Sequence, residues 1–303
     1  MPPSGDWRAA LDRIGDAGVA MVIGGIDAGK TTLVAALASE LAARGASVGV
    51  VDSDVGQSEI GPPTTVGLAR VAGPITRLAD ATLIAFQFAG VASPARDIRG
   101  VVEATRRMVA RARAERLDHV LVDTSGLVLG WPGQMLKGRK IEAVDPDVVI
   151  VLERGDECAP IVAGLAGRPR PQVVRLPARG RPGSRTPAAR RQHREAAFDA
   201  YLRDARSVRF ARAAVALELP RGREPADVVG ALCGLDDADG DTIALGIVED
   251  VTRDAVRACA PLPPDAVVRR VRVGRERRDG TPQAPAPVRS RLTPPGQRTG
   301  GVA

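Results

Sequence analysis

Aromatic residues, cysteine and histidine are all scarce in this chain of 303 residues, which contains seven aromatic residues, three cysteines and two histidines. The cysteines, Cys158, Cys233 and Cys259, have no paired spacing, which excludes a disulfide framework and a cysteine-based zinc site. Two histidines are too few for a histidine-rich metal site. Seven aromatic side chains are too few for an extensive surface on which nucleic-acid bases could stack.

Long apolar runs are also absent from the sequence. No stretch of roughly eighteen apolar residues occurs, which excludes a transmembrane helix. The N-terminus lacks the basic segment and following apolar run of a signal peptide. We therefore expect a cytoplasmic protein with no membrane partner. With 44% hydrophobic and 26% charged residues, the composition is typical of a folded chain, and the length fits one large or two ordinary domains.

Arginine carries almost all of the positive charge. Lysine and arginine total 43 residues against 36 acidic ones, for a net charge of +7, but only three of the 43 are lysines. Two segments are strongly basic: residues 168–194 contain nine arginines and no acidic residue, and residues 269–303 contain nine arginines and two acidic residues. Because the rest of the chain is acidic on balance, only these two clusters are candidates for contacts with an anionic partner.

Short apolar runs alternate with amphipathic segments over the first two thirds of the chain. We predict buried strands at 19–23, 47–52, 82–88, 120–123, 148–152 and 173–176. We predict helices at 5–17, 30–44, 96–115 and 188–206. This alternation favours an α/β fold with a doubly wound parallel sheet and right-handed crossovers.

The pattern changes after residue 206. The runs Val228–Leu235 and Thr242–Val248 flank an acidic turn at 236–241, which predicts a β-hairpin. We therefore divide the chain into an α/β domain at 1–206, a small antiparallel β-rich C-terminal domain at 207–279 and a disordered tail at 280–303. Within the second domain, residues 269–278 are predicted to form an outer strand with a solvated basic face.

One loop matches the phosphate-binding pattern G-x-x-x-x-G-K-[ST], between the strand at 19–23 and the helix at 30–44. In such a loop, glycines let backbone N–H groups surround the phosphates, Lys30 can reach the β- and γ-phosphates, and the Thr31 hydroxyl can hold Mg²⁺. The helix N-terminus adds positive charge at the same point. The pattern predicts a P-loop NTPase. Its nucleotide-binding residues are Gly24, Gly25, Ile26, Asp27, Ala28, Gly29, Lys30, Thr31 and Thr32.

Carboxylates follow two further strands of the predicted sheet, at the edge where ligands bind in such folds. Asp54 lies in the loop just after the strand at 47–52, where it can contact a metal through water and accept a proton from an incoming hydroxyl. Gln57 can orient that hydroxyl or a water molecule. The stretch Asp123–Gly126 ends another strand and has the form of a Walker B aspartate or a GTPase switch.

A predicted lid at 177–194 contains six arginines between Arg179 and Arg194. Glycines and prolines make its first part a loop, and its later part is helical in pattern. An arginine-rich loop that opens into a helix suits a lid closing over phosphates, because guanidinium groups bind phosphate oxygens in pairs. The alternative is a solvated basic surface loop.

Taken together, these motifs resemble the polynucleotide 5′-hydroxyl kinase family of P-loop proteins. That family includes the eukaryotic pre-mRNA cleavage-complex RNA kinase, the nucleolar ribosomal-RNA-processing kinase and a compact archaeal RNA kinase. The most specific part of the likeness is the Asp-Val-Gly-Gln stretch within Asp52–Pro63, accompanied by the P-loop and by Val122–Gly126. The likeness spans roughly residues 19–205, and the later β-rich segment is similar to the C-terminal domain of the compact archaeal members.

The resemblance implies that the γ-phosphate of ATP is transferred, with Mg²⁺, to the 5′-hydroxyl of a single-stranded or end-exposed RNA, and sometimes of DNA. It implies that Asp54 is the base and, with Thr31, a metal-holding residue. Stabilisation of the migrating phosphoryl group falls to Lys30, Arg185 and Arg190. Contacts with the substrate strand fall to Gln57, Thr124 and Ser125.

The sequence departs from the family pattern at the substrate-contacting segment. The family has Thr-x-Gly-Trp, whereas here Gly126 is followed by leucine and the next tryptophan is Trp131. At this distance from the motif, we expect Trp131 to pack in the interior rather than to stack on a terminal base.

Two other interpretations stay open. The chain could be a nucleotide-dependent switch or assembly factor that hydrolyses ATP or GTP without a nucleic-acid acceptor, with Gln57 orienting the hydrolytic water. A GTP-reading N-K-x-D motif would then follow the strand at 148–152, but Glu153–Asp156 keeps only the aspartate. The chain could also be an RNA-binding scaffold without turnover, an interpretation that the intact Lys30, Thr31, Asp54 and Gln57 disfavour.

Overall fold

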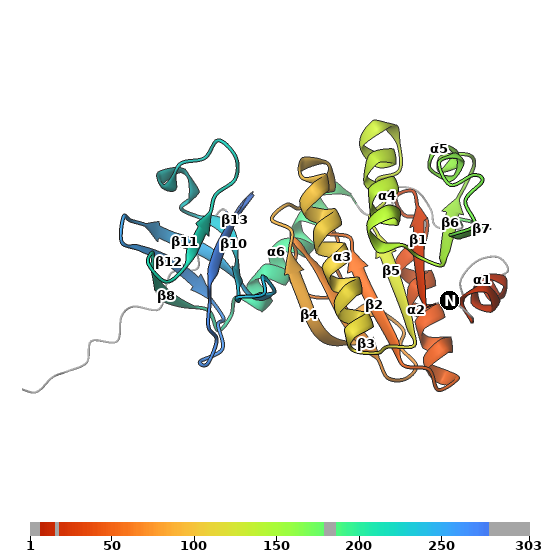
Figure 1. Cartoon of the computed structure of the whole chain (residues 1–303), viewed down its shortest axis with the longest axis horizontal. Coiled ribbons are helices and arrows are strands. Elements are labelled where there is room, and N and C mark those ends of the chain that lie inside the picture. The colour runs from red at the N-terminus through yellow and green to blue at the C-terminus, as the bar shows by residue number, and fades with distance from the viewer. Residues whose placement is uncertain (1–6, 16–17, 179–185, 279–303) are drawn as a thin grey trace, which may run out of the picture.

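A computed structural model describes residues 7–15, 18–178 and 186–278 and arranges them around two β-sheets (Figure 1). The predicted tail at 280–303 and residues 179–185 of the predicted lid, which include Arg185, lie outside the described residues. None of the helices in the described part of the chain is long and apolar enough to cross a membrane.

The first sheet has seven strands in the order β4-β3-β2-β5-β1-β6-β7. They are β1 (Val19–Gly24), β2 (Val48–Ser53), β3 (Thr65–Val71), β4 (Thr82–Phe88), β5 (His119–Thr124), β6 (Val148–Glu153) and β7 (Gln172–Pro177). This arrangement confirms the predicted α/β class and doubly wound parallel sheet, with one departure at β3. Strand β3 runs antiparallel to both β2 and β4. Its connections to these neighbours contain no crossover helix, and short connections of this kind join antiparallel strands.

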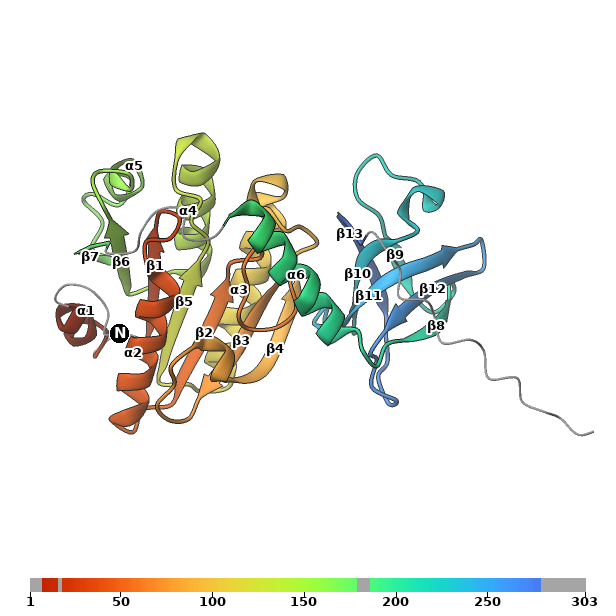
Figure 2. The same cartoon turned by 180° about the vertical axis from the view of Figure 1, so that it is seen from behind.

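Six α-helices accompany the strands within the described ranges: α1 (Trp7–Ile14), α2 (Lys30–Ala43), α3 (Ile98–Ala114), α4 (Gly130–Val144), α5 (Ala159–Ala163) and α6 (Pro187–Tyr201). Three short 3₁₀ helices are η1 (Leu78–Asp80), η2 (Pro94–Arg96) and η3 (Pro225–Val228). Helices α3, α4 and α5 cover one face of the first sheet, and α1 and α2 cover the other (Figures 1 and 2).

Strand β1 illustrates why this sheet must be covered on both sides. All six of its residues are buried. Val19, Met21 and Ile23 pack toward α3 and α4, whereas Ala20 and Val22 pack toward α2, because successive side chains alternate between faces. Burial of each large aliphatic side chain contributes about 1.5–3 kcal/mol, so the central strands hold their carboxyl ends in fixed positions at the edge where the P-loop begins.

The second sheet has six strands in the order β8-β12-β11-β10-β13-β9. They are β8 (Arg206–Ala211), β9 (Ala216–Glu218), β10 (Ala231–Asp236), β11 (Thr242–Val251), β12 (Ala255–Ala260) and β13 (Arg270–Arg277). The predicted hairpin is confirmed as β10 and β11, which pair antiparallel. The division of the chain at residues 206 and 279 into domains stays a prediction.

The expectation of a solvated outer strand at 269–278 is wrong. Strand β13 lies between β10 and the short strand β9, so both of its edges are paired. Two of its arginines form ion pairs, Arg270 with Glu218 at 3.1 Å and Arg272 with Asp236 at 3.0 Å. The positive charge of this segment is therefore partly neutralised inside its own sheet.

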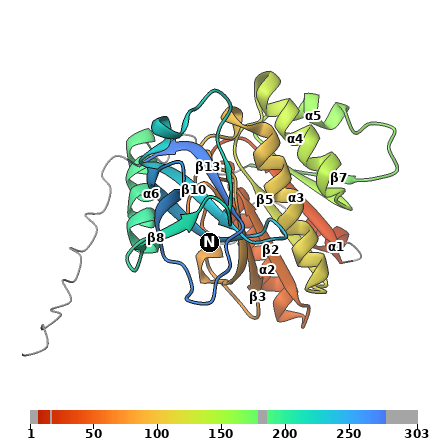
Figure 3. The same cartoon turned by 60° about the vertical axis from the view of Figure 1, so that its left-hand side comes forward.

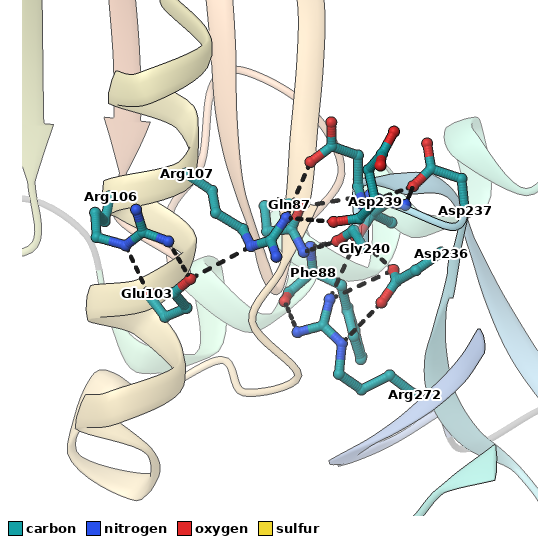
Figure 4. Close-up of polar contacts among 12 residues, drawn as sticks. Gln87, Phe88, Glu103, Arg106, Arg107, Asp236, Asp237, Asp239, Gly240 and Arg272 are labelled. Carbon is teal, nitrogen blue, oxygen red and sulfur yellow. Dashed lines mark hydrogen bonds and ion pairs between the residues drawn. The ribbon is translucent and has the colours of Figure 1, made fainter. Parts of the chain in front are cut away.

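A buried polar cluster joins the two sheets (Figure 4). The Arg272 guanidinium donates to the Asp236 carboxylate and, at 2.9 Å, to the backbone carbonyl of Phe88 at the end of β4. The Thr242 hydroxyl donates to Asp236 at 2.8 Å and accepts from the backbone N–H of Phe88 at 3.0 Å. Because Asp236 is fully buried, these partners take the place of water around its carboxylate.

A second set of contacts lies beside this cluster. The Gln87 side chain donates to the Gly240 carbonyl at 3.0 Å, and the guanidinium of Arg107 on α3 forms an ion pair with Asp241 at 3.1 Å. Both acceptors belong to the acidic turn between β10 and β11 (Figure 4). The turn that marked the hairpin in the sequence is thus also one of the places where the second sheet contacts β4 and α3.

We expect Arg272→Met to lower the free energy of unfolding by about 3 kcal/mol, because it leaves the buried Asp236 carboxylate without its ionic partner. Arg270→Met is the matched control on the same strand. It removes an exposed ion pair and should cost less than about 1 kcal/mol. Urea unfolding followed by circular dichroism measures both. Equal losses in the two variants would contradict the role given to Arg272.

Candidate active site

The P-loop connects β1 to α2 at the carboxyl edge of the first sheet. Gly29 adopts a left-handed conformation with φ of 96° just before Lys30, the first residue of α2, and only glycine adopts this conformation readily. The Lys30 side chain is buried, and its ammonium donates to the Gly25 carbonyl at 2.8 Å. Burial lowers the pKa of Lys30, and the nearby carboxylates of Asp123 and Asp54 oppose that shift.

Thr31 and Asp123 form a pair beside this lysine. The Thr31 hydroxyl donates to Asp123 Oδ2 at 2.6 Å, while Asp123 Oδ1 is buried and has no hydrogen-bond partner among the described residues. Burial raises the pKa of Asp123 to about 6, against the opposing effects of Lys30 and Thr31. An unpartnered carboxylate oxygen next to a threonine hydroxyl suits a hard cation that prefers oxygen ligands.

This pair fits Mg²⁺ as P-loop proteins bind it. The described residues contain no group of three or more histidine, cysteine or acidic side chains that could hold a metal by themselves. Magnesium is commonly held by one or two protein oxygens together with phosphate oxygens, which is what Thr31 and Asp123 offer beside the P-loop. The prediction named Thr31 and Asp54 as metal-holding residues. The geometry adds Asp123, whose Walker B form the sequence indicated.

Asp52 and Asp54 have different surroundings although they are two residues apart. Asp52 is buried, and its carboxylate accepts hydrogen bonds from the backbone N–H groups of Glu59 at 2.6 Å and Ile60 at 3.2 Å. Burial, with Asp123 and Asp54 nearby, raises the pKa of Asp52 to about 8, and the backbone donors oppose this. Asp52 is therefore engaged in internal hydrogen bonds, which hold the loop after β2 against the end of that strand.

Asp54 is only half-buried, and its two oxygens have different surroundings. Its Oδ1 accepts from the backbone N–H groups of Gly56 at 3.1 Å and Gln57 at 3.2 Å. Its Oδ2 has no hydrogen-bond partner in the part of the chain that the structure describes. The Gln57 amide donates to the Gly56 carbonyl at 2.7 Å, and its Oε1 has no partner there either. The loop thus fixes the orientation of the carboxylate and leaves one acceptor unused.

Thr124 and Ser125 at the end of β5 also differ. The Thr124 hydroxyl donates to the Val22 carbonyl at 2.7 Å and accepts from Lys137 at 2.8 Å, so it is engaged within the protein. The Ser125 hydroxyl is buried without a partner among the described residues. Substrate contact by either residue stays a prediction. Gly126 packs against the P-loop, since a Cβ at this position would lie 2.7 Å from the Cα of Ile26.

Helix α6 brings two arginines of the predicted lid to the same edge (Figure 2). Arg190 forms an ion pair with Asp27 of the P-loop at 3.6 Å, and Arg194 approaches the Gly56 carbonyl at 3.5 Å. The first half of α6 therefore spans the P-loop and the loop that carries Asp54. Arg185, the other predicted lid residue, lies outside the described residues.

Sequence reasoning missed three basic residues that support these loops. Arg154 after β6 donates to the Ile26 carbonyl at 3.3 Å and to the Asp27 carbonyl at 2.7 Å, which fixes the backbone of the P-loop. Lys137 and Lys140 on α4 are fully buried beside the ends of β5 and β2. Burial lowers the pKa of Lys140 to about 8 and lowers that of Lys137 well below its ordinary value. The rarity of lysine was the signal that could have found the last two.

The expectation that Trp131 packs in the interior is wrong. Its side chain is 67% exposed in the first turn of α4, and Leu129 beside it is 68% exposed. Ile26 of the P-loop is also largely exposed. Helix α4 begins at Gly130 and buries the face formed by residues further along, so its first turn points these apolar side chains outward.

Known proteins resemble this chain both in sequence and in fold. A family model described as mRNA cleavage and polyadenylation factor CLP1 P-loop matches residues 24–204. The polyribonucleotide 5′-hydroxyl-kinase of Thermococcus kodakarensis is 37% identical over 198 residues, which cover 65% of this chain and 55% of the relative. That of Pyrococcus furiosus is 36% identical over 190 residues, 63% of this chain and 52% of the relative. That of Pyrococcus horikoshii is 43% identical over 145 residues, 48% of this chain and 40% of the relative.

The chain thus spans about half the length of the curated relatives that it matches. Among solved structures, that of the wild-type Clp1p–Pcf11p complex matches with a TM-score of 0.67 at 12% identity, covering 89% of this chain and 77% of that one. This likeness concerns the fold and extends over both sheets. The family model includes residues 24–32, which the structure forms into a loop between β1 and α2 that encloses the Lys30 ammonium.

Proposed function

The chain belongs to the mRNA cleavage and polyadenylation factor CLP1 P-loop family, and on this premise we propose that it transfers the γ-phosphate of ATP to the 5′-hydroxyl of RNA. The observation that carries the proposal is the environment of Asp54. One of its oxygens is fixed by two backbone N–H groups and the other is unpartnered among the described residues, beside a P-loop with its own Thr31–Asp123 pair. Because Asp54 does not belong to the Thr31–Asp123 pair, its carboxylate can take the proton of the hydroxyl that receives the phosphate.

The nucleotide would lie against residues 24–32. The backbone N–H groups of the loop and the N-terminus of α2 would surround the β- and γ-phosphates. Lys30, now hydrogen-bonded to the Gly25 carbonyl, would turn its ammonium toward the phosphates. Thr31 and Asp123 would hold Mg²⁺, with Asp54 a more distant partner through water. When bound, Mg²⁺ neutralises charge on the phosphate oxygens of the nucleotide.

Asp54 would act as the general base. The 5′-hydroxyl oxygen forms a bond to the γ-phosphorus as the bond from that phosphorus to the β–γ bridging oxygen breaks, and ADP leaves. The hydroxyl proton passes to Asp54 Oδ2, which must lie about 2.6–3.2 Å from the hydroxyl oxygen. Arg190 and Arg194 would neutralise charge on the transferring group, as arginines do in many phosphoryl transfers.

The acceptor is proposed as RNA because the relatives that the chain matches are named polyribonucleotide 5′-hydroxyl-kinases. The unused hydroxyl of Ser125 and the exposed side chains of Trp131 and Leu129 lie on the same strand-end segment and the helix that follows. They are candidates for contacts with the terminal nucleotide. Whether DNA is also accepted is an outcome of the test below.

The alternative, a switch NTPase without a nucleic-acid acceptor, gains no specific support from the segment after β6. In a GTP-dependent switch, this segment would read the base. Here the Arg154 side chain holds the P-loop backbone, and the Glu157 carboxylate accepts from the backbone N–H groups of Arg154 and Gly155, both at 2.9 Å. Arg154 thus supports the P-loop, and Glu157 supports the loop after β6.

We expect labelled γ-phosphate to pass from ATP to a short single-stranded RNA with a 5′-hydroxyl, and not to the same RNA with a 5′-phosphate. The reaction should require Mg²⁺. A DNA oligomer of the same sequence, measured in parallel, sets the sugar preference. Release of free phosphate with no label on either nucleic acid would contradict the kinase proposal and favour the switch NTPase.

A further inference from the structure

All three lysines of the chain lie buried around the proposed active site. Lys30 is 7% exposed, and Lys137 and Lys140 are 0% exposed. The other basic residues are arginines, and most of those that the structure describes are at least partly exposed. The chain uses arginine for nearly all of its positive charge, and it has lysine only at these three buried positions.

The two lysines of α4 reach two different strand ends. Lys137 donates to the Thr124 hydroxyl at 2.8 Å and to the Ser125 carbonyl at 2.5 Å, directly after Asp123. Lys140 donates to the Ser53 carbonyl at 3.0 Å and also to the Ser53 hydroxyl, directly before Asp54. Because they are three residues apart, they lie on one face of the helix and contact β5 and β2 together.

The chemistry of lysine suits this enclosed position. An ammonium is compact and has three donors that rotate together about one bond, whereas a guanidinium is a wide planar fork. Burial of an ammonium is costly unless every donor finds a partner, and apolar side chains would fill the same space at lower cost. A purely structural helix face would therefore favour leucine or methionine here, so the retained lysines point to a role in the site.

We propose that Lys137 and Lys140 are positioning residues for phosphoryl transfer, holding the backbone beside Asp123 and Asp54 so that both carboxylates keep the orientation needed at the metal-bound nucleotide. The inference rests on the proposed function for its transfer measurement. It makes α4 the common support of the metal-holding aspartate and the base. Groups that support metal-binding side chains in this way typically change metal affinity or activity by about 10–100-fold when removed.

The test compares Lys137→Met, Lys140→Met and the control Arg139→Met. Arg139 is on the same helix, and its side chain contacts Met135 at the exposed surface, outside the proposed machinery. Three quantities are measured for each variant: the transfer rate as a function of Mg²⁺ concentration, the affinity for ATP in EDTA, and thermal unfolding. A non-hydrolysable ATP analogue then reports, without any acceptor, how much Mg²⁺ strengthens nucleotide binding.

For both lysine variants, kcat should fall by about 30–100-fold at low Mg²⁺, and the half-saturating Mg²⁺ concentration should rise by about 10-fold. ATP affinity in EDTA should change by less than about 3-fold, and Arg139→Met should behave as the wild type. An unchanged Mg²⁺ dependence, or a loss of EDTA-state nucleotide binding and thermal stability in parallel with kcat, would overturn the proposal.

If the methionine variants do not fold, Ser53→Ala supplies the decisive measurement. It removes one acceptor of Lys140 and leaves the charge in place, and it should raise the half-saturating Mg²⁺ concentration by about 3-fold; no rise overturns the proposal. Failure of the proposed function is recognised separately. In that case the wild type labels no RNA, while the Mg²⁺ linkage of analogue binding still tests the two lysines.

Discussion

Asp54→Asn is expected to reduce phosphoryl transfer to a 5′-hydroxyl RNA by about 10³-fold or more while leaving ATP affinity within a factor of about three. Asparagine keeps the size of the side chain, and its Oδ1 can still accept from the backbone N–H groups of Gly56 and Gln57. The loop after β2 should therefore keep its shape. What is lost is an acceptor for the hydroxyl proton, because the amide that replaces Oδ2 is a donor.

Single-turnover transfer with saturating ATP and RNA measures this step directly, and an equilibrium binding measurement with ATP accompanies it. Asp80→Asn is the control, since Asp80 is an exposed aspartate that likewise accepts from a nearby backbone N–H, that of Arg77 at 3.0 Å. It should transfer phosphate at the wild-type rate. Transfer by Asp54→Asn at more than about a tenth of the wild-type rate would remove Asp54 as the base and leave Asp123 as the next carboxylate to test.

The parts of this site that were predicted from the sequence are those encoded by neighbouring residues. A strand, a glycine-rich loop and a helix follow one another between Val19 and Ala43, so the P-loop could be recognised without knowledge of its tertiary contacts. Asp54 and Asp123 could be assigned to the same edge because parallel strands end together. The hairpin of β10 and β11 was predictable because its turn and both its strands are contiguous.

Helix α4 could not be predicted from the same kind of pattern. Its sequence begins Gly-Trp-Pro-Gly and contains a third glycine at Gly138, which together lower the intrinsic preference for a helix. Its buried face includes Lys137 and Lys140, so a search for apolar periodicity counts two core positions as surface. Their burial depends on acceptors in β2, 87 residues before Lys140, and in β5, 13 residues before Lys137. Apolar periodicity reports neither contact.

The choice among the lid arginines also required the tertiary structure. Along α6 and its C-cap residue, every fourth residue lies on one side of the helix: Arg190, Arg194, Phe198 and the C-cap Leu202. The two arginines contact loops of the site, whereas Phe198 and Leu202 pack in an apolar cluster with Phe88 of β4 and with residues of β10 and β11. Figure 3 shows α6 along one side of the second sheet. This row of four side chains therefore holds α6 in place near both of its ends.

From this anchoring we expect the double variant Arg190→Ala and Arg194→Ala to reduce the rate of phosphoryl transfer by about 10³-fold. Packing at Phe198 and Leu202 fixes where α6 lies, so the helix cannot shift to bring another arginine over the P-loop and the Asp54 loop. Stopped transfer reactions with labelled ATP give the rate, and ATP binding is measured separately. Arg203→Ala, an exposed arginine just beyond α6, should be without effect.

The loss of transfer rate, compared with the loss of ATP affinity, distinguishes two roles for Arg190 and Arg194. If they act on the transferring group, the transfer rate falls by far more than ATP affinity, because their contacts strengthen only as charge moves onto the leaving oxygen. Equal losses would mean that they bind ATP and its transition state alike, and Arg185 would then be the lid residue to examine. No loss in either would leave Arg190 as an ordinary partner of Asp27 and would exclude α6 from the lid.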